Sequence, residues 1–476
     1  MTMERTTRIV VALAAALGLV LAVFLARSRP GYFASVTYLG GFLFLQFLVI
    51  SVWHYRKLFF FFLMTSFFFA GMAVPFQGMW TQARWLVLAV GAAVGYVLWM
   101  KSAENHFGVF RVIAFFCVCS AFVSAMVSQF AEISFYKCLS LALLFLYASS
   151  GARVAVLDRE KGFIDSLLVA TELLTAAAAI ATFAAGYALL GNPNSLGAVM
   201  GVLSVPILFW GTLVAETRLI RARRGTLLLL ALIMLYSSRS RAGILGSALA
   251  VFIVCFALRR HRLLAKITLA ALCTLGAFGV AAPGSLKMFS DSFTQDVLFK
   301  GHQEAGLLGS RRSPWQKTVE SIQASPWFGT GYGTSPSGED PGLYLGKFSS
   351  TVEVRREHGT SYLEILEWVG LLGILPFVAL LGYLGGKIGV TLWRLRISGD
   401  ITHPSIPLIL VLMSGAMHAG LEDWLFAVGY YLSVAFWVLA FVFVDLAPGA
   451  PVPERNGATW VPDVPRSFTG VAPMPQ

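Results

Sequence analysis

Two pairs of arginines have the chemistry to bind an anion. Arg239 and Arg241 directly follow an apolar run, and Arg311 and Arg312 precede a serine and a proline. A guanidinium fork fits phosphate oxygens through two hydrogen bonds, and an arginine at membrane depth normally faces a cavity or a partner. We therefore expect an anion-binding site. The alternatives are contact of the first pair with lipid phosphates and salt bridges of the second pair to nearby acids.

The sequence around the second pair predicts a short helix. Ser313, Pro314 and Gln316 form a helix start, and apolar residues then recur at helical spacing up to Pro326. The helix dipole disfavours cations at this end, and an anion between the arginines and the helix would offset that cost. Glycines at residues 329, 331 and 333 follow in a spacing that indicates a flexible turn rather than a phosphate loop.

His358 is the candidate catalytic base. It stands three residues before Ser361, which forms a capping box with Glu364 and predicts the start of the next spanning helix. The dipole of that helix disfavours an imidazolium and helps to keep the ring able to accept a proton near pH 7, whereas Glu357 and the arginines at 355 and 356 act on the ring in opposite directions. The alternative is an incidental loop histidine. Glu364 is a capping residue first and a chemical group second.

His418, Glu422 and Asp423 form a further cluster near the end of the chain. His418 and Glu422 are one helical turn apart at the outer end of a predicted span. A supporting role in a site and a solvated helix end both fit this placement. We expect no metal, because no third ligand stands at metal-binding spacing.

These residues lie in a chain of 476 residues that is 57% hydrophobic and 13% charged. Soluble proteins average about a quarter charged residues, so the composition predicts an all-α polytopic integral membrane protein. We expect about 12–14 transmembrane helices from runs of about 20 apolar residues, the first centred near residue 17. The net charge of +12 sits in short clusters between these runs, as in cytoplasmic loops, and does not indicate nucleic-acid binding.

The positions of the basic clusters predict which parts lie on which side of the membrane. The clusters fall in alternate connections, so the positive-inside rule places the long polar interval outside the cytoplasm. The predicted parts are a transmembrane bundle at residues 1–283, a partly helical extracytoplasmic loop at 284–360, C-terminal transmembrane helices at 361–446 and a proline-rich cytoplasmic tail at 447–476.

Several of these stretches together resemble the O-antigen ligase and polymerase superfamily of bacterial inner membranes. The resemblance rests on the stretch 192–197 with Asn194, the stretch 238–243 with its two arginines, Arg311 before Trp315, and His358 before Tyr362. Their order around one large outer loop is typical of the family. One departure is that His358 lies one residue farther from Tyr362 than the family pattern has it.

The resemblance implies a GT-C-like, inverting glycosyltransferase that needs no metal or cofactor. It would act at the periplasmic face of a Gram-negative inner membrane, transferring a glycan from undecaprenyl pyrophosphate to a sugar hydroxyl of lipid A-core. His358 would orient or deprotonate that hydroxyl. The residues that would hold the pyrophosphate and stabilise its charge are Arg239, Arg241, Arg311 and Arg312. The supporting residues would be Asn194, Glu364, His418 and Glu422.

Three other functions stay open at this point. A polymerase of the same superfamily would join repeat units on the same carrier, but two substantial outer loops are expected there. A protein O-oligosaccharyltransferase would share the motifs and carry additional C-terminal spans. A flippase for the lipid-linked glycan is the non-enzyme alternative, and it would favour inverted repeats and mid-membrane charges.

Overall fold

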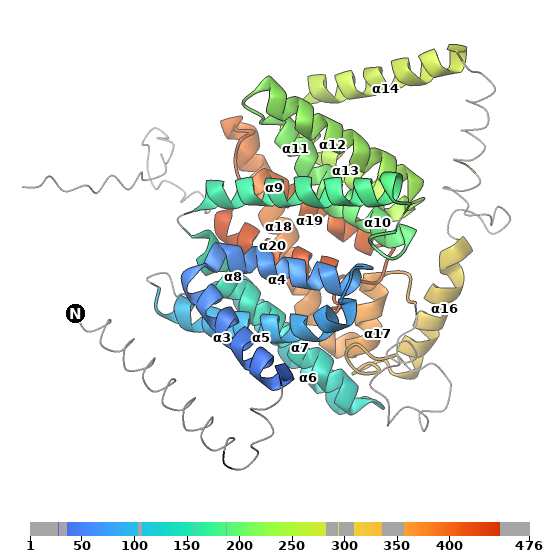
Figure 1. Cartoon of the computed structure of the whole chain (residues 1–476). Helices are drawn as coiled ribbons and strands as arrows, with labels where there is room; N and C mark the ends of the chain where they lie inside the picture. Colours follow the sequence, from blue (N-terminus) through green and yellow to red (C-terminus); the bar gives the residue numbers. More distant parts are fainter. Residues whose placement is uncertain are drawn as a thin grey trace, which may run out of the picture.

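The computed structural model of the chain describes residues 36–102, 107–157, 159–186, 188–281, 309–335 and 357–447, with residues 27 and 294. These residues form helices joined by turns and include no strand, as the composition predicts (Figure 1). The predicted run near residue 17, much of the long polar interval and the proline-rich tail lie outside the described residues.

Six segments of the described chain are long and apolar enough to cross a membrane, which confirms a polytopic membrane protein. They are α5 (Gln77–Met100), α6 (Val109–Met126), α7 with α8 (Ala131–Ser149, Gly151–Val156), α9 with the π-helix η1 (Glu160–Ala179, Ile180–Ala184), α10 with η2 and α11 (Pro193–Val199, Met200–Ser204, Val205–Leu213), and α18 (Leu375–Ser398).

Further predicted runs fold as shorter apolar helices. These are α13 (Arg241–Ala257), α19 (Ser405–Ala419), α20 (Tyr431–Leu446) and the end of α3 (Val36–His54). The remaining helices are α4 (Arg56–Gly71), α12 (Arg218–Ser237), α14 (His261–Ala281), α16 (Gly309–Ala324) and α17 (Ser361–Gly373). The six spans and the four shorter apolar helices make ten in the described residues, which is below the predicted 12–14.

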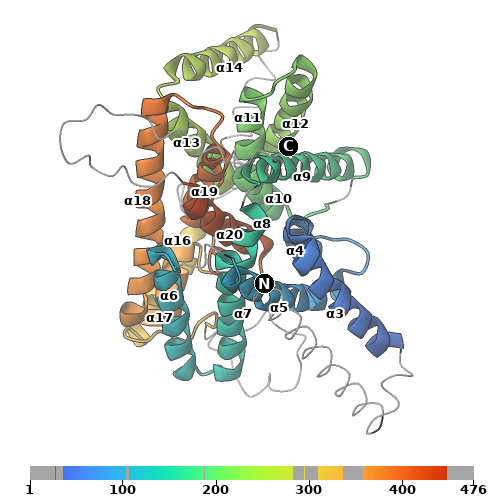
Figure 2. The same cartoon turned by 90° about the vertical axis from the view of Figure 1, so that its left-hand side faces the viewer.

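Helix α20 lies at the centre of the bundle. Every residue from Tyr431 to Phe443 is buried, as expected for a helix that is apolar on all sides. It packs against α4, α7, α8 and α19 (Figures 1 and 2). Its Trp437 and Ser433 side chains donate to the carbonyl of Leu425, at 2.7 and 2.9 Å. The buried helix thereby fixes the loop that precedes it.

Glycines bring the stretch 192–204 against the arginine-bearing turn between α12 and α13. A Cβ atom on Gly201 would lie 2.6 Å from the Cα of Gly243, and one on Gly197 would overlap Ser240. Only glycine permits this approach of two helices. Asn192 caps α10 by accepting from the Ser195 amide at 2.7 Å. Two motifs that are distant in sequence thus form one surface.

The two ends of the bundle differ in chemistry. Near the start of α6, Arg111 forms a bidentate ion pair with Asp445 at the end of α20, at 2.7 and 2.8 Å. Near the other end of α6, the Ser124 hydroxyl donates to the Trp368 carbonyl. The arginines at 218–224 likewise begin α12, whose other end is the turn that carries Arg239. These basic residues therefore lie at the end opposite to the polar loops.

Two predicted helix boundaries are wrong. The helix expected to start at Ser313 starts at Gly309, so Arg311 and Arg312 lie within its first turn and Pro314 lies inside it. The predicted spanning helix from Ser361 breaks at Gly370, whose φ is +68°, and α18 forms the span instead. The reason is a backbone contact: a Cβ on Gly370 would come within 2.5 Å of the Trp327 carbonyl carbon.

Candidate active site

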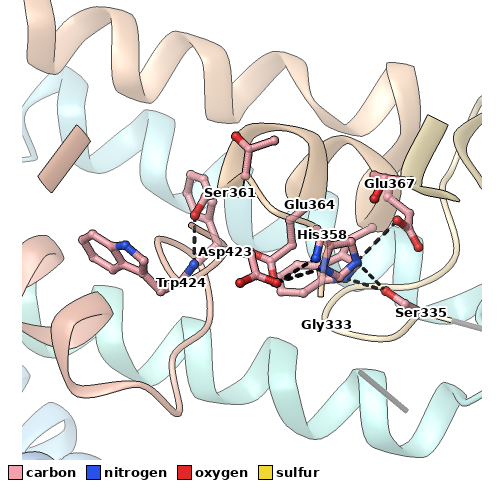
Figure 3. Close-up of polar contacts among 12 residues, drawn as sticks. Gly333, Ser335, His358, Ser361, Glu364, Glu367, Asp423 and Trp424 are labelled. Atoms are coloured by element: carbon pink, nitrogen blue, oxygen red, sulfur yellow. Dashed lines mark hydrogen bonds and ion pairs between the residues drawn. The ribbon is translucent and has the colours of Figure 1, made fainter. Parts of the chain in front are cut away.

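Ser361 fixes the loop between α19 and α20 to the start of α17. Its hydroxyl accepts from the amide of Trp424 at 2.9 Å (Figure 3). It also donates to the Glu422 carbonyl at 2.7 Å and accepts from the amide of Leu425 at 3.0 Å. The predicted N-cap role of Ser361 is therefore wrong, because its hydroxyl binds this loop. Thr360 takes the cap, accepting from the Tyr362 amide at 3.4 Å.

The glycine turn after α16 caps the C-terminal end of α17's first segment. The amides of Thr330 and Gly331 donate to the carbonyls of Glu367 and Trp368, at 2.9 and 3.1 Å. Gly331 has a φ of +108°, a conformation that a residue with a Cβ rarely adopts. The turn is thus a fixed structural element. It places Ser335 beside His358.

His358 lies fully buried among polar side chains from three segments of the chain. Its Nδ1 is 3.3 Å from Asp423 Oδ2 and 3.8 Å from Glu364 Oε1. Its Nε2 is 2.9 Å from Ser335 Oγ and 3.3 Å from Glu367 Oε2 (Figure 3). The backbone amide of His358 also donates to Asp423 Oδ2, at 2.9 Å. Both ring nitrogens therefore face oxygen atoms that can accept a proton.

This environment favours the protonated ring. Burial by itself lowers the pKa of His358, but hydrogen bonds to Asp423 and Glu367, together with the charges of Glu364 and Glu367, raise that pKa to about 9. The helix dipole, which favours a neutral ring, is outweighed by carboxylates that the tertiary fold brings to the ring.

Arg311 is enclosed by acids. Its guanidinium donates to Glu357 through Nη1 and to Glu422 through Nη2, and the residue is 8% exposed. The predicted salt bridges are thus present, and Arg311 is a bridge between two loops. Arg241 lies close enough for the charges of Arg311 and Glu422 to act on it. The site therefore joins the turn before α13 to α16.

The other two arginines of the predicted anion site are exposed. Arg312 lies in the first turn of α16. Arg239 lies in the turn between α12 and α13 with a φ of +53°, a left-handed conformation that is uncommon for arginine. The structure thus brings Arg241 and Arg311 together. Arg239 lies two residues before Arg241 and Arg312 directly follows Arg311, and both side chains are exposed.

A cavity of about 400 Å³ opens beside these residues. Residues of three segments line it: Asn192, Asn194, Ser195 and Ala198 from α10 and its cap, Glu357 from the long interval, and His418, Glu422, Asp423, Trp424 and Tyr430 from α19 and the loop after it. Asp423 is thus the member of the His358 cluster that reaches the cavity. The predicted supporting residues Asn194, His418 and Glu422 share one wall.

The predicted helical spacing of His418 and Glu422 is wrong, because α19 ends at Ala419. Glu422 lies in the following loop and pairs with Arg311. His418 accepts from the indole nitrogen of Trp424 at 2.8 Å. His418 therefore lines the cavity from the end of α19, and Glu422 lines it from the loop that follows.

Three oxygen and nitrogen atoms near His358 converge in a way that could hold a metal ion. One ligand atom each from His358, Glu364 and Asp423 lies within 4.8 Å of the others. The ring nitrogen of His358 that faces this group is Nδ1, which lies within hydrogen-bonding distance of Asp423 Oδ2. The same atoms can therefore share a proton instead of a metal ion. The absence of a metal requirement stays a prediction.

Several residues of the cluster were missed or undervalued by sequence reasoning. Glu367 follows Glu364 by three residues, which places both on one helix face, and that spacing could have predicted it. Ser335 reaches His358 only because the glycine turn folds back on α17, where the indole of Trp368 donates to the Ser335 hydroxyl. No sequence spacing indicates that contact.

The fold and the site define a polytopic helical membrane protein with a histidine–carboxylate cluster, neighbouring arginines and a polar cavity. Residues 226–378 match the family model described as O-Antigen ligase. The predicted resemblance to the O-antigen ligase/polymerase superfamily is therefore confirmed over these residues. No curated protein matches the chain.

The match contains the two arginine pairs, His358 and Glu364. The cavity wall formed by Asn194, His418 and Asp423 comes from segments outside it. The members of this family are glycosyltransferase-like enzymes whose substrates are lipid-linked glycans in a bilayer.

Proposed function

We propose that the protein is an O-antigen ligase that transfers a glycan from undecaprenyl pyrophosphate to a sugar hydroxyl of lipid A-core. The observation that carries the proposal is the cavity of about 400 Å³ that is lined by Asp423 of the His358 cluster and by Glu357 and Glu422, the two partners of Arg311. The reaction is inverting and independent of metal. It takes place at the periplasmic face of a Gram-negative inner membrane.

The orientation is supported by the charges at the other end of the bundle. Arg111 lies near the start of α6 and the arginines at 218–224 begin α12, and the opposite ends of these helices lie beside Trp368 and at the turn that carries Arg239. The arginines at 394 and 396 lie at the end of α18. Positive residues mark cytoplasmic connections. The cavity end then faces the periplasm, where both lipid-anchored substrates can reach it.

The donor's pyrophosphate is assigned to the arginines. Arg241 begins α13, where the helix dipole adds to its charge and favours an anion. Arg311 forms ion pairs with Glu357 and Glu422. When the donor binds, a pyrophosphate oxygen replaces Glu357 as a partner of the Arg311 guanidinium, and Glu422 stays in place. Arg239 and Arg312 screen the remaining charge. Together these cations stabilise undecaprenyl pyrophosphate as the leaving group.

The acceptor hydroxyl is assigned to Asp423. This carboxylate lines the cavity, while His358 holds it through a ring nitrogen and its backbone amide. The acceptor oxygen attacks the anomeric carbon, the bond from that carbon to the pyrophosphate oxygen breaks, and the hydroxyl proton passes to Asp423. His358 acts as an imidazolium that keeps Asp423 ionised and aimed, a role that fits a pKa of about 9 better than that of a base at neutral pH.

The test is reconstitution of the purified protein with lipid-linked glycan and lipid A-core. Ligated lipid A-core is the expected product. Glycan joined to a second lipid-linked unit would indicate a polymerase, and glycan on an acceptor peptide would indicate a protein O-oligosaccharyltransferase. Movement of the glycan lipid across a vesicle membrane with no product would refute the enzyme and favour the flippase.

A further inference from the structure

The hydrogen bond between Trp424 and His418 fixes the protonation of His418. An indole nitrogen only donates, so Nδ1 of His418 accepts this 2.8 Å bond and carries no proton. An imidazolium has protons on both nitrogens and is excluded by the same bond. The ring is therefore neutral, with its proton on Nε2. That nitrogen is a donor without charge.

The Nε2 donor has no hydrogen-bond partner in the described part of the chain. His418 is 2% exposed, its Nε2 is buried, and the residue lines the cavity beside Glu422 and Asp423. A buried donor left unsatisfied costs about 1–3 kcal/mol, so such groups normally have a partner. A ligand oxygen in the cavity would be that partner.

The cavity wall suits a neutral polyhydroxylated ligand better than an anion. Asn192, Asn194 and Ser195 can donate to and accept from hydroxyls, and Glu422 and Asp423 can accept from them. The carboxylates disfavour a phosphate at this position. Trp424 and Tyr430 add aromatic surface of the kind that small-molecule sites commonly contain. Sugars have this combination of hydroxyls and an apolar ring face.

We propose that the cavity is a sugar-binding subsite in which the Nε2–H of His418 donates to a hydroxyl or ring oxygen of one sugar residue. The inference rests on the proposed glycosyl transfer and adds the position of a sugar to it. The pyrophosphate binds outside this cavity, at the arginine-bearing segments. Trp424 serves the subsite by fixing the tautomer of His418. The sugar belongs either to the donor glycan or to lipid A-core, since both present the same hydroxyl chemistry.

Binding measurements on three probes test the proposal. The probes are undecaprenyl pyrophosphate, the same lipid carrying the glycan, and lipid A-core. His418→Phe keeps the size of the ring and removes the donor. It should bind the sugar-free lipid as the wild type does and bind one of the two sugar-bearing lipids about three- to ten-fold more weakly, as expected for one neutral hydrogen bond. The lipid that is affected identifies the source of the sugar.

Two further variants make the comparison specific. His418→Gln retains a donor near the Nε2 position and should recover most of the lost affinity. His403→Phe is the matched control, because His403 precedes the other end of α19 and lies outside the cavity lining. It should bind all three probes normally. An equal loss with the sugar-free lipid, or no loss with either sugar-bearing lipid, would overturn the proposal.

Nuclear magnetic resonance spectroscopy of the wild-type protein tests the proposal without any variant, so the result does not depend on whether a variant folds. With ¹⁵N-labelled histidine, the ring of His418 should show a neutral tautomer protonated on Nε2, and this signal should shift when the affected sugar-bearing lipid is added. A ring protonated on Nδ1, or on both nitrogens, would contradict the assignment. Absence of transfer by the wild type would refute the proposed function separately, because sugar binding is read without turnover.

Discussion

Removing the carboxylate of Glu367 should change the pH at which the enzyme loses activity. The pKa of His358 lies about 2.5 units above its ordinary value, which corresponds to about 3 kcal/mol at ~1.36 kcal/mol per unit. Glu367 contributes both a contact of 3.3 Å to Nε2 and a charge. Removing this carboxylate takes away both a hydrogen bond and a charge that raise the pKa. Glu367→Gln should therefore lower the pKa of His358 below about 9.

The sign of the effect follows from the raised pKa. A group whose pKa is raised on folding is protonated below its folded value and loses the proton as the pH rises through it. If the imidazolium holds Asp423, transfer by the wild type falls as the pH passes about 9, and transfer by Glu367→Gln falls at a lower pH. At pH 9 the wild type should keep about half of its rate at pH 7, and the variant less than half.

The assay is the pH profile of glycan transfer in the reconstituted system, each variant normalised to its own rate at pH 7. Glu320→Gln is the control, because Glu320 is an exposed residue of α16 that takes no part in the cluster. A wild-type rate that rises with pH through about 9 would show that the neutral ring is the base and would refute the imidazolium role. An unshifted profile in Glu367→Gln would refute the assignment of the raised pKa to this carboxylate.

The same residue gives a prediction that needs no substrate. The stability contributed by protonated His358 is fully present below about pH 6.5 and is lost as the pH rises through about 9. The melting temperature in detergent should therefore fall over this range, and it should fall over a lower range in Glu367→Gln. An identical pH dependence in the two proteins would contradict the linkage.

Other substitutions test the elements around the cluster. Ser361→Ala leaves the amides of Trp424 and Leu425 without their acceptor, so the melting temperature should drop, at about 1–3 kcal/mol per unsatisfied group, and transfer should drop with it. Unchanged transfer would show that the hydrogen bonds of the Ser361 hydroxyl do not position Asp423. Gly201→Ala should destabilise by about 1–3 kcal/mol through contact with the Gly243 backbone, whereas Gly225→Ala, with open space around it, should not. Arg241→Lys and Arg311→Lys should each lower transfer about ten- to hundred-fold, because one point charge replaces a fork, and full activity would indicate lipid anchoring. Transfer should persist after chelation of divalent metals, and its loss would assign a metal to His358, Glu364 and Asp423.

The amino-acid sequence determined the elements that depend on local chemistry. Apolar runs become helices because backbone groups in lipid must be hydrogen-bonded within their own segment. Asn192 and Ser240 cap their helices because a short polar side chain can reach an amide two or three residues ahead. The helix before Pro326 ends as predicted. The match at residues 226–378 likewise rests on motifs that are readable along the chain.

The limits of sequence reasoning appear at residues whose partners are distant along the chain. Ser361 has the sequence context of an N-cap, yet its hydroxyl binds a loop more than sixty residues away. Arg311 could be identified as a candidate from its position, but its enclosure by Glu357 and Glu422 depends on where two other segments come to lie.

The protonation of His358 shows the same division most clearly. Its sequence neighbours supply a helix dipole, which favours a neutral ring. Glu364 and Glu367 come from one face of α17, and Asp423 comes from a loop held by Ser361. Charges at such short distances in a buried site outweigh the partial charge of a helix end. The sequence by itself thus determined which residues were available, and the tertiary structure alone decided their charges, since electrostatic energy depends on separation in space.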